Sequence, residues 1–235
     1  MMRWFGWLLA AWGGIVPACV LAAGVATVQA GDRTLTVSFD GPDARVDISG
    51  VAQGYLLMRD GKLYSVMRAG GRPLVMDGDA VVRLLGGAAI QTGPDMIRSL
   101  TRIEPTGARE TVAGRAGAVY AVSYRDEQGR SRSGQGVLGK QPEVRELTRA
   151  LGRMAVLLQT AAGQSPDGAR QALDALEEKG LGLLAYEKQF RVERLAATPP
   201  VPGTLDLPAQ PTQLPPELGQ LLPELGQLLQ GLRRR

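Results

Sequence analysis

The amino-acid sequence predicts an α+β fold: a curved antiparallel sheet with a two-helix insertion before its last strands, followed by a proline-rich C-terminal tail. Short strand-like segments separated by turn residues fill most of the stretch from residue 34 to residue 138. Two amphipathic segments follow between residues 142 and 180, and seven prolines lie within residues 199–216. Because many short strands precede the helices rather than alternate with them, antiparallel pairing is favoured over parallel βαβ units.

The first 23 residues predict a secretory signal peptide. Arg3 precedes an apolar stretch, Trp4–Val16, and small residues follow up to Ala22 and Ala23. This order of a short cationic end, an apolar core and a small-residue exit is typical of export signals. We therefore expect cleavage after Ala22 or Ala23, with Ala30 as the second choice, and a location in the periplasm.

Two alternatives stay open for this segment. The run from Trp4 to Val28 has no charge and is long enough to span a bilayer, so an uncleaved chain would be anchored in the inner membrane. The residues before Cys19 resemble a lipobox, although Pro17 and the apolar residues after the cysteine fit that motif poorly. All three tryptophans and the single cysteine lie in the segment that cleavage would remove, and the whole chain has no histidine.

Turn signals separate the predicted strands of the first half. Thr34–Phe39 alternates with period two and ends at an Asp-Gly-Pro-Asp turn. An Asp-Gly pair between Tyr55–Met58 and Leu63–Met67 is a strong hairpin signal. Ala80–Leu85 fits a short helix and an apolar strand equally well. Further strands are predicted at Leu74–Met76, Leu100–Glu104, Glu110–Ala113, Ala118–Tyr124 and Arg130–Leu138.

The two predicted helices have recognisable ends. Pro142 suits the first position of a helix, and apolar residues recur at intervals of three and four from Val144 to Leu158. The second helix is expected to begin after the N-cap residue Ser165 and to end at Gly180. The last two strands are predicted at Leu181–Tyr186 and Phe190–Leu195.

Several segments together resemble a known family. They are GYLLMRDGKLYSVM, GRPLVMDGDAV, IEPTGARETVAG, VYAVSY and GLLAYEKQFRVERL, in this order between residues 54 and 195. With the proline-rich exit they resemble the bacterial domain-of-unknown-function 4412 family, which is similar to the lipoprotein-carrier (Lol-type) half-barrels of the Gram-negative periplasm. The resemblance spans Thr27 to Pro208. It implies a half-barrel over residues 24–198, wrapped around a helical plug and often holding an apolar cavity, and it implies no reaction.

Motifs for chemistry are weak, so we predict no enzyme activity, no catalytic residue, no cofactor and no metal site. The lack of histidine excludes a Ser-His-Asp triad and imidazole metal ligands. Gly134–Gly139 matches the dinucleotide pattern GxGxxG, but the segment before it is too polar for a buried parallel strand. The acidic turns Asp40–Asp43 and Asp77–Asp79 lack a calcium-binding loop, and the charged residues within Glu104–Glu110 fit solvated strand ends.

The charge balance argues against nucleic-acid binding. Without Arg3 the chain has 26 basic and 23 acidic residues, and the excess of three equals the arginines at positions 233–235. The folded body is therefore close to neutral, whereas a nucleic-acid surface needs basic residues clustered on one face. We expect no nucleic-acid partner.

Methionines on predicted inward faces are the candidate lining of a cavity. A flexible thioether suits an adaptable binding surface, although filling an ordinary core explains these residues as well. The candidates are Met58, Met67, Met76 and Met154.

The tail is predicted to have two parts, an extended proline-rich linker at residues 199–215 and a leucine-rich segment at residues 216–235. The second part repeats PELGQLL without change, and a helix would place its leucines on one face. That face would need an apolar partner: the cavity of the body, another protein, or a membrane surface with the arginines at the headgroups. A disordered tail is the alternative. The candidate residues are Leu218, Leu221, Leu222, Leu225, Leu228, Leu229, Leu232, Arg233, Arg234 and Arg235.

The sequence thus predicts an exported, non-enzymatic protein that binds an apolar ligand, such as a lipid, or a lipid-modified partner, such as a lipoprotein. The alternative is a structural or interaction protein with a solid core that docks through its leucine-rich tail. An apolar cavity would distinguish the two, because only the first function needs one.

Overall fold

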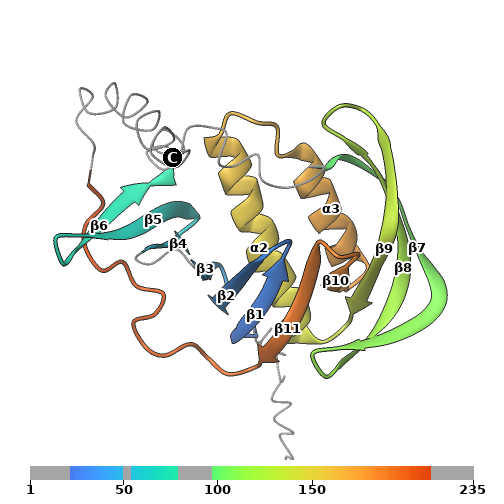
Figure 1. Cartoon of the computed structure of the whole chain (residues 1–235), viewed down its shortest axis with the longest axis horizontal. Helices are drawn as coiled ribbons and strands as arrows, with labels where there is room; N and C mark the ends of the chain where they lie inside the picture. The colour runs from blue at the N-terminus through green and yellow to red at the C-terminus, as the bar shows by residue number, and fades with distance from the viewer. Residues whose placement is uncertain (1–21, 50–53, 79–96, 213–235) are drawn as a thin grey trace, which may run out of the picture.

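The computed structural model describes residues 22–49, 54–78 and 97–212, which form an antiparallel sheet of eleven strands with two helices (Figure 1). The strand order is β6-β5-β4-β3-β2-β1-β11-β10-β9-β8-β7. The strands before the helices are Gly24–Ala30 (β1), Arg33–Asp40 (β2), Asp43–Ile48 (β3), Gly54–Arg59 (β4), Lys62–Ala69 (β5), Arg72–Asp77 (β6), Ile97–Val112 (β7), Arg115–Asp126 (β8) and Ser131–Gly139 (β9). Then come Pro142–Ala161 (α2), Asp167–Glu178 (α3), Gly182–Tyr186 (β10) and Phe190–Ala196 (β11).

The α+β class, the antiparallel sheet and the insertion of two helices before the last two strands are confirmed. The sheet ends at β6 and β7 and is neither closed nor strongly curled, which is less curvature than the expected half-barrel has. The predicted strands Leu100–Glu104 and Glu110–Ala113 belong to one strand, β7, whose pairing with β8 shifts between Pro105 and Arg109. Ala80–Leu85 lies outside the described residues.

Strand β1 lies at the centre of the sheet, between β2 and β11. Ala26 is 1% and Val28 0% exposed, so the strand is part of the core. The sequence pattern misses this strand because the apolar run of the N-terminal segment continues into it. Cleavage after Ala30 would remove β1, so of the expected cleavage sites only those after Ala22 and Ala23 leave the sheet complete.

The main core lies between α2 and the sheet. The predicted apolar stripe of α2 is buried at Val144, Leu147 and Met154 and half-buried at Leu151 and Leu158. The helix contacts β1, β2, β5 and β10, so it crosses the middle of the sheet. The largest core residues on the strands facing it include Val28, Val37, Phe39, Leu184 and Val192.

Residues 197–212, which include most of the predicted linker, pack on the sheet and are called here the proline-rich strap. In Figure 1 they form the orange segment that runs from β11 back to β6. Leu205, Leu207 and Ala209 contact a second core that is separate from the one under α2. This second core consists of Leu57, Tyr64, Val66 and Val75, from β4, β5 and β6.

Hydrogen bonds fasten the strap at two places. Arg59 Nη1 donates to the Leu205 carbonyl at 2.9 Å and to the Asp206 carboxylate at 3.1 Å. The Thr212 amide donates to the Val75 carbonyl at 2.8 Å, on the edge strand β6. The strap has neither helix nor strand, as its proline content predicts, but composition alone does not predict that it contacts the sheet.

Candidate functional site

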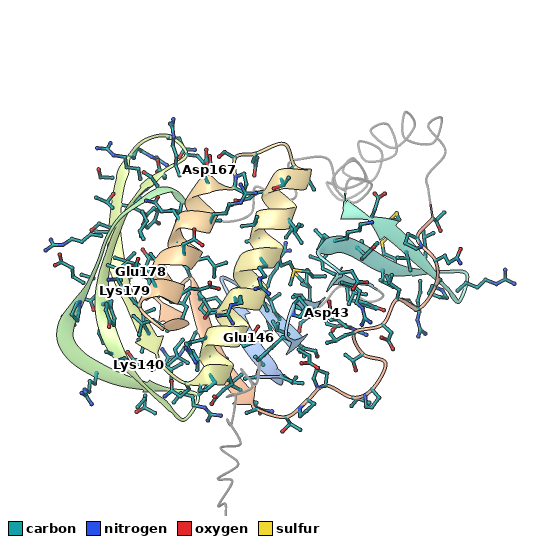
Figure 2. The ribbon with its side chains drawn as sticks, turned by 180° about the vertical axis from the view of Figure 1, so that it is seen from behind. Asp43, Lys140, Glu146, Asp167, Glu178 and Lys179 are labelled. Carbon is teal, nitrogen blue, oxygen red and sulfur yellow. The ribbon has the colours of Figure 1, made fainter. Side chains whose placement is uncertain are left out.

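An apolar cavity of about 860 Å³ lies between α3 and the sheet. In Figure 2, Asp167 and Glu178 mark the two ends of α3, which lies beside β7, β8 and β9. The walls of the cavity come from α3, from β1 to β3, and from β7 to β11. The apolar and aromatic lining residues are Ala30, Leu35, Ile48, Ile97, Leu100, Ile103, Val122, Tyr124, Leu138, Ala172, Leu176, Leu183, Tyr186 and Phe190.

The first turn of α3 lies very close to the sheet. Gly168 is the fully buried residue of α3, and a β-carbon built on it would lie 1.8 Å from the Ile97 carbonyl oxygen. In the following turns Ala172 and Leu176 line the cavity and are only half-buried. Protein interiors are normally close-packed, so the short side chain at position 172 contributes to space that is not filled.

Polar contacts fix α3 in this position. The Gln171 side-chain oxygen accepts a hydrogen bond of 2.9 Å from the Leu100 amide on β7. Arg149 on α2 donates to Glu177 on α3 at 2.6 Å and also pairs with Glu146 on its own helix. The hydrogen bond to Glu177 is the main cause of a raised pKa at Arg149. These contacts join α3 to β7 and to α2.

Charged residues occupy one rim of the cavity, which we call the turn rim. They belong to the β1–β2 and β10–β11 turns, which are joined by a hydrogen bond of 2.8 Å from the Gly31 amide to the Gln189 carbonyl. Asp32, Arg33 and Lys188 are exposed there, and none of them forms an ion pair with a residue in the described part of the chain. Two cations and one anion line this rim, and Glu187, which is exposed beside Lys188 and accepts a hydrogen bond from the Gln135 amide, brings the formal charge of the two turns to zero.

A buried carboxylate closes the β8–β9 hairpin, which supplies one wall. Asp126 is 0% exposed and accepts hydrogen bonds from the Arg130 amide (2.9 Å), Arg130 Nε (2.7 Å) and Arg132 Nε (3.0 Å). Removal from water raises the pKa of Asp126, but these hydrogen bonds together outweigh that effect, so its pKa lies below the ordinary value. The hairpin end near Tyr124 is therefore held by an ionised group.

The GxGxxG motif lies within β9, which pairs with β8 and β10, rather than in a turn that opens a helix. A β-carbon on Gly134 would lie 2.7 Å from the Tyr186 hydroxyl, and one on Gly136 would lie 3.5 Å from the Tyr186 ring. These glycines leave room for Tyr186, which lines the cavity. The motif thus has a packing role in this fold.

The predicted acidic motifs are not brought together. Glu104 pairs with Arg102, and Glu110 pairs with Arg191 at 3.1 Å, both as exposed ion pairs. Asp43 contacts Arg59 at 3.4 Å. Within the described ranges, no group of three or more acidic or cysteine residues is placed to hold a metal ion.

The candidate methionines lie away from the cavity. Met58 and Met154 belong to the main core, Met76 is buried, and Met67 is half-buried on β5. None of the four is among the described residues that line the cavity. The tail residues from Leu218 to Arg235 lie outside the described residues.

Part of the lining lies in elements that the sequence predicts. Ala172 and Leu176 lie within the predicted second helix, line the cavity and are half-buried. Phe190 and Leu183 lie in the predicted last strands, but nothing in a strand pattern distinguishes a cavity wall from a filled core.

Comparison of the chain with family models, with curated proteins and with solved structures finds no match. Neither helix of the described residues is long and apolar enough to cross a bilayer. The function of the cavity therefore has to come from its own size and chemistry.

Proposed function

We propose that this protein is an exported, non-enzymatic binding protein that holds an apolar ligand, or the acyl chain of a lipid-modified partner, in the cavity between α3 and the sheet. The observation that carries the proposal is the cavity itself. Its volume of about 860 Å³ falls within the range of roughly 300–1,000 Å³ typical of ligand sites. Its walls are mainly hydrocarbon, which suits an apolar ligand better than a polar substrate.

The lining favours binding over catalysis. Acid–base catalysis needs ionisable groups placed against the reacting atoms. The walls of the cavity are mainly aliphatic, with the ring of Phe190 and two phenols, Tyr124 and Tyr186. The charged groups among the lining residues belong to the exposed turn rim. This distribution supports a protein that shields a ligand from water.

The predicted signal peptide and the family resemblance support the same function. Export after cleavage at Ala22 or Ala23 would deliver a body with a complete central strand to the periplasm. A Lol-type half-barrel, which the resemblance implies, would use the helix-covered face of its sheet for the ligand, and that is the face that holds this cavity. The tail at residues 216–235 would then be free to act as a separate docking element.

A fluorescent fatty acid tests the proposal. The purified protein should take up the probe and release it to unlabelled lipid, with a negative heat-capacity change by calorimetry. Each methylene added to a competing alkyl chain should strengthen binding by about 0.8 kcal/mol until the cavity is full.

A matched pair of substitutions on α3 locates the site. Ala172→Phe fills the cavity and should weaken probe binding about tenfold or more, because the ring occupies the space of the ligand. Ala175→Phe makes the same change on the same helix at a position that lines a different, polar groove beside β7, and it should leave binding nearly unchanged. No uptake of any probe by the folded protein would overturn the proposal and favour the interaction protein with a docking tail.

A further inference from the structure

The charges at the turn rim point to the kind of headgroup that the ligand carries. We infer that the cavity selects amphiphiles with an anionic headgroup, which Arg33 and Lys188 bind at the turn rim while the apolar chain fills the cavity. This inference rests on the proposed function, because it needs a chain in the cavity. It adds a selectivity that an apolar wall alone cannot provide.

The two cations are available for a ligand. Arg33 begins β2 and Lys188 lies in the β10–β11 turn, and both line the cavity. Neither is engaged by an acidic residue within the described ranges, in contrast to arginines such as Arg45, Arg59 and Arg115, each of which pairs with a carboxylate. A guanidinium and an ammonium group beside one opening are suited to carboxylate or phosphate oxygens.

Their position is fixed by the backbone. Ala30 pairs with Arg33 across the β1–β2 turn and with Phe190 in β11, so the two turns lie next to each other. The hydrogen bond from the Gly31 amide to the Gln189 carbonyl holds them together. The cations therefore stand at one end of the cavity, where the headgroup of a chain inserted under α3 would remain in contact with water.

Asp32 repels an anionic headgroup, so its removal should change the affinity in the opposite direction to the removal of a cation. It lies next to Arg33 in the same turn, and it is exposed without an ion-pair partner in the described chain. Glu187, the other carboxylate of the two turns, lines a neighbouring groove, so Asp32 is the carboxylate among the described residues that line the cavity. Apolar walls of low dielectric constant strengthen the effect of each of these charges. Removing this carboxylate should strengthen the binding of an anion, whereas removing either cation should weaken it.

The test compares ligands that share a sixteen-carbon chain and differ in headgroup: palmitate, hexadecyl phosphate, hexadecanol and hexadecyltrimethylammonium. Each competes with the fluorescent probe on the full-length protein at low and at high salt, below its critical micelle concentration. We expect the two anions to bind more tightly than the alcohol and the cation to bind most weakly, with the difference reduced at high salt. The tighter of the two anions identifies the headgroup as a carboxylate or a phosphate.

Substitutions then assign the preference to residues. Arg33→Gln and Lys188→Gln should each lower the affinity for palmitate by about two- to fivefold, which is the range of an exposed ion pair. The affinity for hexadecanol should not change. Asp32→Asn should raise the affinity for palmitate by up to about fivefold on the same basis. Lys62→Gln removes the same charge from the distant β4–β5 hairpin and should change the affinity for neither ligand.

The outcomes separate the two claims. Equal affinity for all four headgroups, or no effect of the Arg33 and Lys188 variants on palmitate, overturns the headgroup inference and leaves the apolar cavity standing. Failure of every sixteen-carbon ligand to compete, together with no uptake of the probe, overturns the proposed function and the inference with it. Circular dichroism of each variant verifies that a loss of binding is not a loss of fold.

Discussion

Asp126 shows how a single buried charge can shape the wall of a cavity. Its carboxylate receives three hydrogen bonds from Arg130 and Arg132, and it closes the hairpin that carries Tyr124 into the lining. A buried carboxylate is stable only when such partners replace its hydration. The lowered pKa of Asp126 means that folding favours its ionised form.

The lowered pKa of Asp126 predicts a specific pH dependence. A depressed folded-state pKa contributes stability that is fully present above the unfolded pKa of about 3.9 and is lost as the pH falls through the lower, folded value. We expect Asp126→Asn to lower the urea midpoint at pH 7. The difference in midpoint between this variant and the unsubstituted protein should become smaller below about pH 4. Urea unfolding at pH 7 and pH 3 measures this.

Glu127→Gln is the matched control for that substitution, because it changes an exposed acid at the adjacent position. Its midpoint should follow that of the unsubstituted protein at both pH values. If the difference in midpoint between Asp126→Asn and the unsubstituted protein stays constant down to pH 3, the charge of the carboxylate does not stabilise the fold.

At the scale of elements, the proline-rich strap is the part of the fold that composition describes least well. Leu205, Leu207 and Ala209 alternate with polar or cyclic residues, so one side of an extended segment is apolar. That alternation is a signal of a docked segment, but the prolines around it favour a solvated linker. The strands beneath it, β4 to β6, have apolar runs without strict alternation because both of their faces are buried.

Truncating the leucines of the strap tests whether it stabilises the sheet. Leu205→Ala and Leu207→Ala should each lower the free energy of unfolding by about 1–2 kcal/mol, less than the roughly 2–5 kcal/mol of a fully buried leucine, because both are half-buried. Val201→Ala in the same segment is the control, since Val201 is 76% exposed and should have almost no effect. Equal midpoints for all three variants in urea would mean that the strap adds no stability.

The sequence predicted some elements well and others poorly for physical reasons. The stripe from Val144 to Leu158 specifies α2, and the Asp-Gly pair specifies the β4–β5 hairpin, because both signals are local. Strand β3 alternates Ala44 and Val46 with charged residues, a period-two signal that is short but local. The cavity could not be predicted, because it depends on how far α3 stands from strands that are distant in sequence.

At the scale of the whole molecule, the predicted export signal and the folded sheet meet in the N-terminal segment. The predicted signal peptide ends where β1 begins, so cleavage after Ala22 or Ala23 would leave the central strand in place. All three tryptophans lie in the part that would be lost. The spectrum of the protein therefore reports whether cleavage has occurred.

Protein isolated from the periplasm should show tyrosine emission only, because the described body contains tyrosine and no tryptophan. Its intact mass should equal that of a chain that begins at Ala23 or Gly24. A truncated chain that begins at Gly31, and so lacks β1, is the control; it should be unfolded by circular dichroism, since the centre of the sheet would be missing. Tryptophan emission from the periplasmic form would show that the segment is retained and would favour the membrane anchor.

The pairing of β1 with β11 also sets the order in which the chain can fold. Val25 pairs with Ala196, so the middle of the sheet joins two strands from opposite ends of the folded body. Contacts so distant in sequence form slowly, because the chain must close a long loop before they contribute any stability. During synthesis the sheet cannot close at its centre until residue 196 has emerged. The strands β1 to β6, and likewise β7 to β9, pair with their sequence neighbours, so the topology leaves the joining of these two halves to the end, when β10 and β11 insert between β9 and β1.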